Sequence, residues 1–326
     1  MLSCMCKEEL MKKTEVKEML KHQRFGVEIE FTGITREKAA NIVAKMFGTV
    51  ASRPIRDGYF TREVEDTKGR TWKVQRDSSI NPVRNDSSVD YDDEYRVELV
   101  TPPLNYEDIE TLQEIVRVLR EAGGKANASC GIHVHVDGAN HDCESMRRLV
   151  NIFTNRQDLI YDALNIGDRA YHWCKKTDPK LFEAMKKEKS LTNYKAERIW
   201  YSDANGGYRG GIDHSHYNST RYQGLNLHAF FTKGTVEFRL FNGTMHAGKI
   251  KAYVQFCLAL SAWAITSNDR IKFNKIGHYT PDQKVKIMNG FLTKRLGLVG
   301  DEFKTCRHHL LKPLKDAAEA YRNMAA

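Results

Sequence analysis

The segment Phe25-Gly-Val-Glu-Ile-Glu-Phe31 constrains this chain most, because apolar and acidic side chains alternate strictly along it. Successive side chains of a β-strand point to opposite faces. The pattern therefore predicts a strand with an apolar face and with Glu28 and Glu30 side by side on the other face. Two neighbouring carboxylates disfavour each other's ionised form unless a cation or a basic group lies between them. The alternative is an outer strand whose polar face lies in water.

Three later segments repeat this design, with one apolar face and one face that carries two ionisable side chains. The pairs are Arg96 and Glu98 in residues 95–100, His133 and His135 in 130–137, and Glu237 and Arg239 in 236–241. Carboxylates, imidazoles and guanidinium groups are the side chains that bind divalent metals and phosphates. Oxygen-rich ligation without thiolates favours Mg²⁺ or Mn²⁺. A lone His-x-His motif also occurs in structural strands and zinc hydrolases, so the prediction depends on all four pairs.

Helices are expected between these strands, where they can cover the apolar faces. Cap and stop residues with apolar periodicity predict helices over residues 36–47, 105–122, 144–164 and 247–266. Strand-favouring residues around Lys68-Gly69 and around Thr232-Lys-Gly234 predict two hairpins, over 59–75 and 222–241. The pattern is that of an α+β protein.

Composition limits the class of protein further. The chain has 326 residues, 41% of them hydrophobic and 29% charged, which is typical of a globular protein. Its most apolar window, 252–266, is shorter than the roughly 20 residues that cross a bilayer, so no membrane partner is expected. No leader is evident and seven cysteines lie scattered, which favours a cytoplasmic protein with reduced thiols. The net charge of +9 suits ATP and anionic substrates, whereas nucleic acid ranks lower because no nucleic-acid motif accompanies it.

We expect three parts along the chain: an N-terminal helical extension (1–24), a catalytic domain (25–266) and a C-terminal helical segment packed on it (267–326). The catalytic domain contains a basic insertion, about 166–221, that is rich in lysine and ends in a glycine-rich turn. Such a segment before a core strand indicates a loop that covers a substrate. A solvated linker is the alternative.

Five motifs of this sequence, taken together and in order, resemble the putative amidoligase family, a branch of the glutamine synthetase and γ-glutamylcysteine synthetase superfamily of carboxylate–amine ligases. The resemblance covers roughly residues 24–265. The motifs are Gly26-Val-Glu-Ile-Glu30, Val97-Glu-Leu-Val-Thr-Pro-Pro103, Gly131-Ile-His-Val-His135, Leu225-Asn-Leu227, and Thr235-Val-Glu-Phe-Arg239 with Asn242-Gly-Thr244.

The resemblance implies a curved, mainly antiparallel sheet with helices on its convex face and Mg·ATP on its concave face. A substrate carboxylate would attack the γ-phosphate to give an acyl phosphate, and an amine or ammonia would then displace phosphate. Metal ions bridging the phosphates and an arginine at the developing charge suit such a transfer.

The resemblance also implies a role for each matching residue. Arg239 would stabilise the transferring phosphoryl group, with Glu237 and Glu28 as further catalytic residues. Glu30, Arg239 and Arg221 would contact the nucleotide, although Arg221 is as easily a surface arginine. The expected metal ligands are Glu28, Glu30, Glu98, His133 and Glu237, and the positions expected near substrate or metal are Asp77, His135 and Asn226.

Two other functions stay open at this point. A metal-dependent amide hydrolase would use the His133-x-His135 strand without ATP, and a basic module would bind nucleic acid or another anion through the lysine-rich insertion. The carboxylate and amine substrates could be small molecules, peptides or protein side chains, and the sequence does not indicate the oligomeric state.

Overall fold

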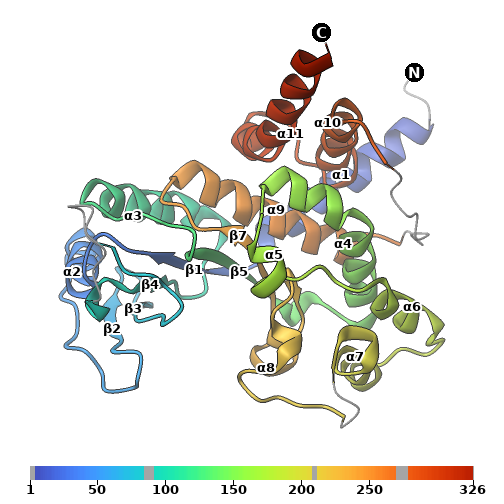
Figure 1. Cartoon of the computed structure of the whole chain (residues 1–326). Helices are drawn as coiled ribbons and strands as arrows, with labels where there is room; N and C mark the ends of the chain where they lie inside the picture. The colour runs from blue at the N-terminus through green and yellow to red at the C-terminus, as the bar shows by residue number, and fades with distance from the viewer. Residues whose placement is uncertain (1–3, 84–91, 208–210, 269–277, 326) are drawn as a thin grey trace. The chain divides into compact units, whose positions relative to one another are not determined.

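The computed structural model of this chain describes residues 4–83, 92–207, 211–268 and 278–325, and shows an α+β protein (Figure 1). Two compact units are distinguished. Unit 1 comprises Met1–Gln23, Val136–Leu240 and Val254–Ala326, and unit 2 comprises Arg24–His135 and Phe241–Tyr253.

Unit 2 is built on strands in the order β2-β3-β4-β1-β5. The pairs β1–β4, β2–β3 and β3–β4 are antiparallel. Because β1 has a neighbour on each side, it is an interior strand, and the alternative of an outer strand is wrong. The bounds are β1 Phe25–Phe31, β2 Arg62–Glu65, β3 Thr71–Gln75, β4 Val97–Val100 and β5 Gly131–Asp137, whose last two residues belong to unit 1.

The apolar face of β1 contributes to the core of unit 2, as the alternation predicts. Its four apolar side chains are at most 2% exposed. The helix α2 (Arg36–Phe47) packs on β2, β3 and β4 and against α3 (Ile109–Glu121). The side chain of Thr35 caps α2, and Gly48 ends it with φ 69°, a conformation that favours glycine. The predicted first hairpin is confirmed as β2 and β3. Short helical turns cover Asp93–Tyr95 and Tyr106–Asp108.

Unit 1 is mainly helical. The long helix α4 lies against β7, where the rings of Phe153 and Phe238 are 6.4 Å apart, and it also packs on α6, α10 and α11. Among the described residues, no helix is long and apolar enough to cross a membrane. The helices are α1 Cys4–His22, α4 Cys143–Leu164, α5 Arg169–His172, α6 Pro179–Lys187, α7 Asn193–Trp200, α8 His228–Lys233, α9 Ala247–Thr266, α10 Pro281–Gly290 and α11 Lys304–Ala325, and the strands are β6 Leu225–Asn226 and β7 Thr235–Asn242.

Shorter helical turns complete the described chain. They cover Gly138–Asn140, Asp203–Asn205, Ser219–Arg221, Phe291–Arg295 and Asp301–Phe303. The helices α9 and α10 confirm predicted helices, and Thr280 caps α10 ahead of Pro281 as its sequence indicates. The last residues of β7, the first residues of α9 and the chain between them (Phe241–Tyr253) belong to unit 2.

The second predicted hairpin is wrong in its first arm. Only Leu225 and Asn226 form a strand, and the chain then enters α8. The Oδ1 atom of Asn226 accepts a hydrogen bond from the backbone N–H of His228 at 2.9 Å, which turns the chain into the helix. Gly234 ends α8 in the left-handed region, with φ 72°. This local side-chain turn leads the two phenylalanines into a helix despite their strand preference.

The described part of the insertion 166–221 is folded. It forms α5, α6 and α7, and Leu181, Phe182 and Met185 of α6 are buried. The alternative of a solvated linker is wrong for this part of the chain, since a linker has no apolar core residues. Residues 208–210 of the predicted glycine-rich turn lie outside the described residues. Whether the segment covers a substrate stays a prediction.

Candidate functional site

A row of polar side chains crosses three neighbouring strands of unit 2. Glu98 on β4 lies directly opposite Glu30 on β1 and directly opposite Gln75 on β3. Residues that face each other across antiparallel strands project to the same side of the sheet. The side-chain Nε2 of Gln75 donates a hydrogen bond to Glu98 Oε2 at 2.7 Å. The register of the strands thus places two carboxylates in one row.

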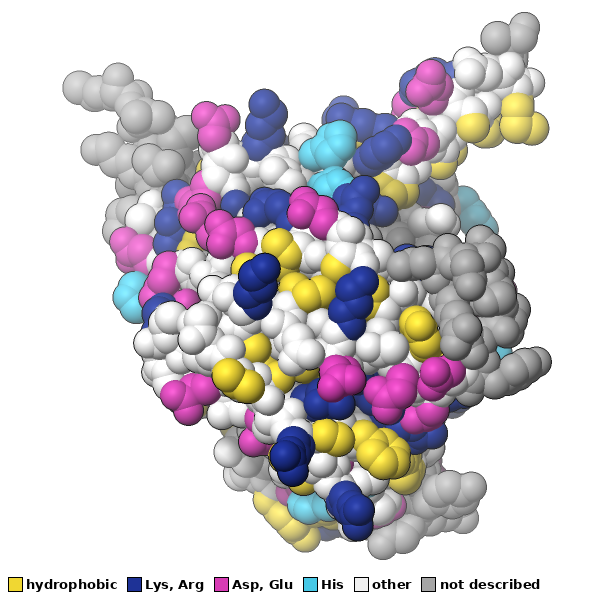
Figure 2. Space-filling model, turned by 90° about the vertical axis from the view of Figure 1, so that its left-hand side faces the viewer, with side chains coloured by type: hydrophobic (Ala, Val, Ile, Leu, Met, Phe, Trp, Pro, Cys, Tyr) yellow, Lys and Arg dark blue, Asp and Glu magenta, His cyan; other side chains and the backbone are white. Residues whose placement is uncertain are grey.

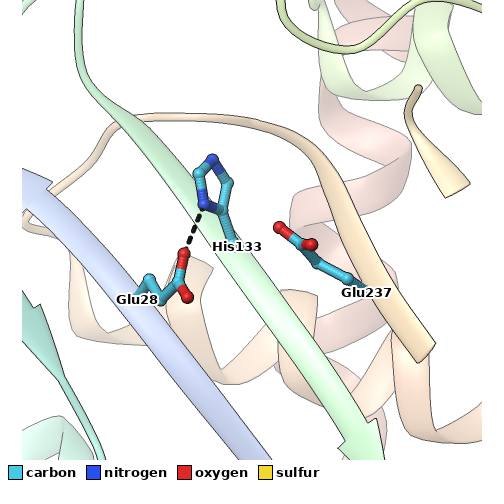
Figure 3. A group of neighbouring side chains, drawn as sticks. All are labelled: Glu28, His133 and Glu237. Atoms are coloured by element: carbon cyan, nitrogen blue, oxygen red, sulfur yellow. Dashed lines mark hydrogen bonds and ion pairs between the residues drawn. The ribbon is translucent and has the colours of Figure 1, made fainter. Parts of the chain in front are cut away.

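His133 on β5 lies between the two carboxylates of β1. Its Nδ1 is 2.7 Å from Glu28 Oε2, an interaction drawn as a dashed line in Figure 3. Its Nε2 is 3.6 Å from Glu30 Oε1. His135 Nε2 is 3.1 Å from Glu28 Oε1. The backbone N–H of Gly131 donates to Glu30 Oε2 at 2.6 Å. The basic group that the alternating acidic strand requires is therefore an imidazole.

We call Glu28, Glu30 and Glu98 the acidic cluster. Glu30 and Glu98 are 4% and 5% exposed, so water screens their charges weakly. Burial alone would raise the pKa of Glu28, but the charge of His135 and the hydrogen bonds to both histidines hold it well below its ordinary value. Glu98 behaves in the opposite way. Burial and then the charges of Glu28, Asp77 and Glu30 raise the pKa of Glu98 well above its ordinary value, and the hydrogen bond from Gln75 offsets this only in part.

Two other residues singled out from the sequence lie beside this row. Asp77 is half-buried after β3, accepts a hydrogen bond from the backbone N–H of Ser79 at 2.7 Å, and is close enough for its charge to act on Glu98. Arg96 precedes β4, and its guanidinium donates to the backbone carbonyl of Ser78. The predicted pairing of Arg96 with Glu98 on one strand is therefore wrong, since only Glu98 belongs to β4.

Ligand atoms of Glu30, Glu98 and His133 all lie within 4.8 Å of one another. Two carboxylates and one imidazole are a donor set that divalent cations accept, with oxygen-rich sites favouring Mg²⁺ or Mn²⁺. The acidic cluster also lacks a guanidinium or ammonium partner for Glu98 in the described part of the chain. A cation at this position would offset the burial and the neighbouring carboxylates that raise the pKa of Glu98, so the residues fit a metal ion.

Unit 1 carries the remaining candidate residues on β6 and β7. Glu237, also drawn in Figure 3, comes from β7 and lies opposite Asn226 of β6. Asn226 Nδ2 donates to Glu237 Oε2 at 2.7 Å, and Arg239 donates to Glu237 Oε1 at 2.6 Å. All three side chains are at most 6% exposed. This arrangement holds a buried guanidinium and a buried carboxylate in fixed positions.

Tyr222 provides an aromatic surface for two arginines of unit 1. The guanidinium carbon of Arg239 is 6.0 Å from the centre of the ring, and that of Arg221 is 5.6 Å from it. Such contacts attract cations to the face of the ring. Arg221 also donates to the backbone carbonyl of His216 at 2.6 Å, so part of its hydrogen-bonding capacity serves the local chain.

The sequence analysis missed Gln75, which orients Glu98. A signal was present, because Gln75 follows Thr71 and Lys73 on the face opposite two buried residues, Trp72 and Val74. Its partner could not be read from the sequence, since this depends on the register between β3 and β4.

Comparison with known proteins places the chain in a family. A family model described as "Putative amidoligase enzyme" matches residues 21–261. Among solved structures, the chain is similar to a bifunctional glutathione synthetase from Pasteurella multocida, with 11% sequence identity and a TM-score of 0.44. The similarity covers 97% of this chain and 52% of that one, so the chain spans about half the length of the synthetase. No curated protein matches the chain. The family model extends over well over half of the 326 residues, and the chain therefore belongs to the family of putative amidoligase enzymes.

Proposed function

We propose that this protein is an ATP-dependent carboxylate–amine ligase that forms an amide or isopeptide bond through an acyl phosphate. Its Mg²⁺ or Mn²⁺ would be held by Glu30, Glu98 and His133, with Glu28 as a further ligand. Membership of the amidoligase family supports the reaction class. The buried acidic cluster supports the need for a divalent cation.

One observation carries the proposal. Glu98 is 5% exposed, its described hydrogen-bond partner is the neutral amide of Gln75, and nearby carboxylates raise its pKa. A carboxylate with a structural role is normally paired with a cation or with several N–H donors. Asp108 in the same unit shows that case, because Lys68 and Arg70 bind it at 2.7 and 2.6 Å. Glu98 differs from Asp108 because no guanidinium or ammonium group pairs with it among the described residues, which supports a role as a metal ligand.

In the proposed reaction, a substrate carboxylate oxygen attacks the γ-phosphorus of ATP and the bond to ADP breaks. The amine then attacks the acyl carbon, loses a proton, and inorganic phosphate leaves. A bound divalent cation supplies neutralisation of phosphate oxygens. Glu30, Glu98 and His133 would hold that cation. Arg239, which is fixed by Glu237 and by the ring of Tyr222, would offer a positive charge to a phosphoryl group.

Purified protein tests this proposal directly. ATP, Mg²⁺ and a panel of carboxylates with amines or ammonia should yield ADP and phosphate only when the correct pair is present. Removal of the metal with EDTA should abolish turnover, and added Mg²⁺ or Mn²⁺ should restore it. Amide cleavage that needs zinc but not ATP would instead identify a hydrolase.

The surface gives no support to a basic nucleic-acid module on the face drawn in Figure 2. On that face, Lys and Arg side chains stand among Asp, Glu and hydrophobic side chains. Nucleic-acid interfaces carry a continuous positive surface that neutralises several phosphates. Steeply salt-dependent binding of DNA or RNA would contradict this interpretation.

A further inference from the structure

Arg169 begins α5, at the start of the basic insertion, and the sequence analysis did not single it out. The residue is 8% exposed, and its Nε atom is buried without a hydrogen-bond partner. No carboxylate pairs with Arg169 in the described part of the chain. A guanidinium has five N–H donors and stays charged at any physiological pH. Its side chain hydrogen-bonds to the thiol of Cys174, which is a neutral partner, and burying a guanidinium without an anionic partner is costly.

The thiol of Cys174 interacts with Arg169 but does not neutralise its charge. The backbone N–H of Cys174 donates to the carbonyl of Arg169 at 3.1 Å, which closes the turn after α5 and brings the thiol against the arginine side chain. Burial raises the pKa of Cys174 to about 11, although the charges of Arg169 and Arg239 partly oppose this. At neutral pH the thiol is therefore uncharged and supplies no anion to Arg169.

The backbone brings Arg239 to the same thiol. The N–H of Gly224 donates to the carbonyl of Lys175 at 2.9 Å, and the N–H of Arg239 donates to the carbonyl of Gly224 at 2.9 Å. The segment after Cys174 is thus hydrogen-bonded to a segment that is itself hydrogen-bonded to β7. Cys174 experiences the charges of both Arg169 and Arg239. Glu237 binds Arg239, so the local excess of positive charge comes from Arg169.

We propose that Arg169 and Arg239, which we call the basic cluster, form an oxyanion-binding site that takes a phosphate or carboxylate group. Guanidinium groups bind such anions through paired N–H donors, and a partly desolvated site strengthens these bonds. The chemistry of the site is independent of the proposed function. Only the source of the anion, either the nucleotide or the substrate carboxylate, rests on the ligase assignment.

Titration calorimetry with the whole protein tests the proposal, with inorganic phosphate, ADP and glutarate as separate probes. We expect Arg169→Gln to weaken binding of the correct probe about 10- to 100-fold, the effect of losing one charged hydrogen-bonding group. Arg169→Lys should recover part of the lost affinity.

The matched control is Arg148→Gln, because Arg148 also lies in unit 1 but donates to the backbone carbonyl of Ala264 at 2.7 Å. This control should bind as the unmodified protein does. A thermal unfolding midpoint for each variant separates lost binding from lost folding.

The probes identify the source of the anion. Loss of ADP binding assigns the site to the nucleotide, and loss of glutarate binding assigns it to the substrate carboxylate. The inference is overturned if the unmodified protein binds none of the three probes, if Arg169→Gln binds all of them unchanged, or if Arg148→Gln is weakened equally. A protein that binds phosphate through Arg169 but never turns over ATP would contradict the proposed function and leave this site standing.

Discussion

The acidic cluster of unit 2 and the basic cluster of unit 1 differ in the sign of the charge that each buries. Both place ionised groups where water reaches them poorly. In the acidic cluster, burial and then the neighbouring carboxylates raise the pKa of Glu98. In the basic cluster, Arg239 has a carboxylate at 2.6 Å, whereas Arg169 has none among the described residues.

The difference shows which charge each region lacks. A folded chain that served only itself would pair these groups internally, as Asp108 is paired with Arg70 and Lys68. Among the described residues, Glu98 instead has no guanidinium or ammonium partner, and Arg169 has no carboxylate partner.

The largest effect is expected from Glu98→Gln. Because this variant removes the negative charge of a proposed metal ligand, ATP-dependent turnover should fall by about 10²-fold or more. Without metal, however, the same variant should unfold at a higher temperature, because a buried carboxylate that its neighbours repel has been removed. Asp108→Asn is the matched control and should lower the free energy of unfolding by about 3 kcal/mol, since it leaves Arg70 and Lys68 without their anion. Differential scanning calorimetry with EDTA checks both. Equal destabilisation by the two variants would make Glu98 a structural residue.

The next effect separates the two arginines of the basic cluster. Arg239→Gln should lower the free energy of unfolding by about 3 kcal/mol, because Glu237 is 3% exposed and would lose its cation. Arg169→Gln should lower it by less than about 1 kcal/mol, since no carboxylate depends on it. Urea unfolding at neutral pH measures both values. A larger loss for Arg169→Gln than for Arg239→Gln would mean that Arg169 holds unit 1 together.

A buried group outside both clusters tests the electrostatic argument itself. Burial lowers the pKa of His141 to about 4, and its ring nitrogens contact the hydroxyls of Ser145 and Ser261 at 3.0 and 2.8 Å. The unfolded chain binds this proton near pH 6.5, so it holds more protons than the folded chain between pH 6.5 and 4. Stability should therefore be complete above pH 6.5 and fall by up to about 3 kcal/mol as the pH drops to 4.

His141→Gln should remove this part of the pH dependence. His228, whose pKa burial also lowers to about 4, remains in both proteins, so the difference between their profiles isolates His141. Urea unfolding at pH 7, 5.5 and 4.5 provides the profiles. Parallel curves would show that His141 does not titrate as its burial requires.

The smallest effect concerns the orientation of Glu98. Gln75→Ala removes the amide that holds Glu98 Oε2 and should weaken Mg²⁺ binding about tenfold, the lower end for a residue that orients a metal ligand. Lys73→Ala is the control on the same face of β3, because Lys73 is paired loosely with Glu63 at 3.8 Å. Calorimetric titration with Mg²⁺ compares the two. Unchanged affinity in Gln75→Ala would mean that Glu98 needs no support from β3.

Local patterns in the sequence predicted the faces of the strands but not their register. The alternation in β1, β5 and β7 was enough to select Glu28, Glu30, His133 and Glu237, because a period of two is a property of the chain itself. The opposition of Glu30 and Glu98 depends on how β1 and β4 pair, which no local pattern encodes.

Arg169 was harder to find from sequence for a different reason. It lies in a helix of four residues within a lysine-rich insertion, where neither periodicity nor a motif marks it. Its burial results from the turn that joins it to Cys174 and from the hydrogen bonds that link this turn to Gly224. The error at α8 has a similar origin, because a hydrogen bond from the backbone of His228 to Asn226 forms a turn before residues that favour strands.

The crowding of Glu28, Glu30 and Glu98 also bears on how long the protein persists in a cell. Like charges buried together lower the free energy of unfolding, and a cation that binds only the folded chain raises it in proportion to the logarithm of its concentration. Chaperones and proteases act on the unfolded fraction, and a change of 1–2 kcal/mol alters abundance several-fold. The amount of this protein would then follow the supply of divalent cation even where its synthesis is constant.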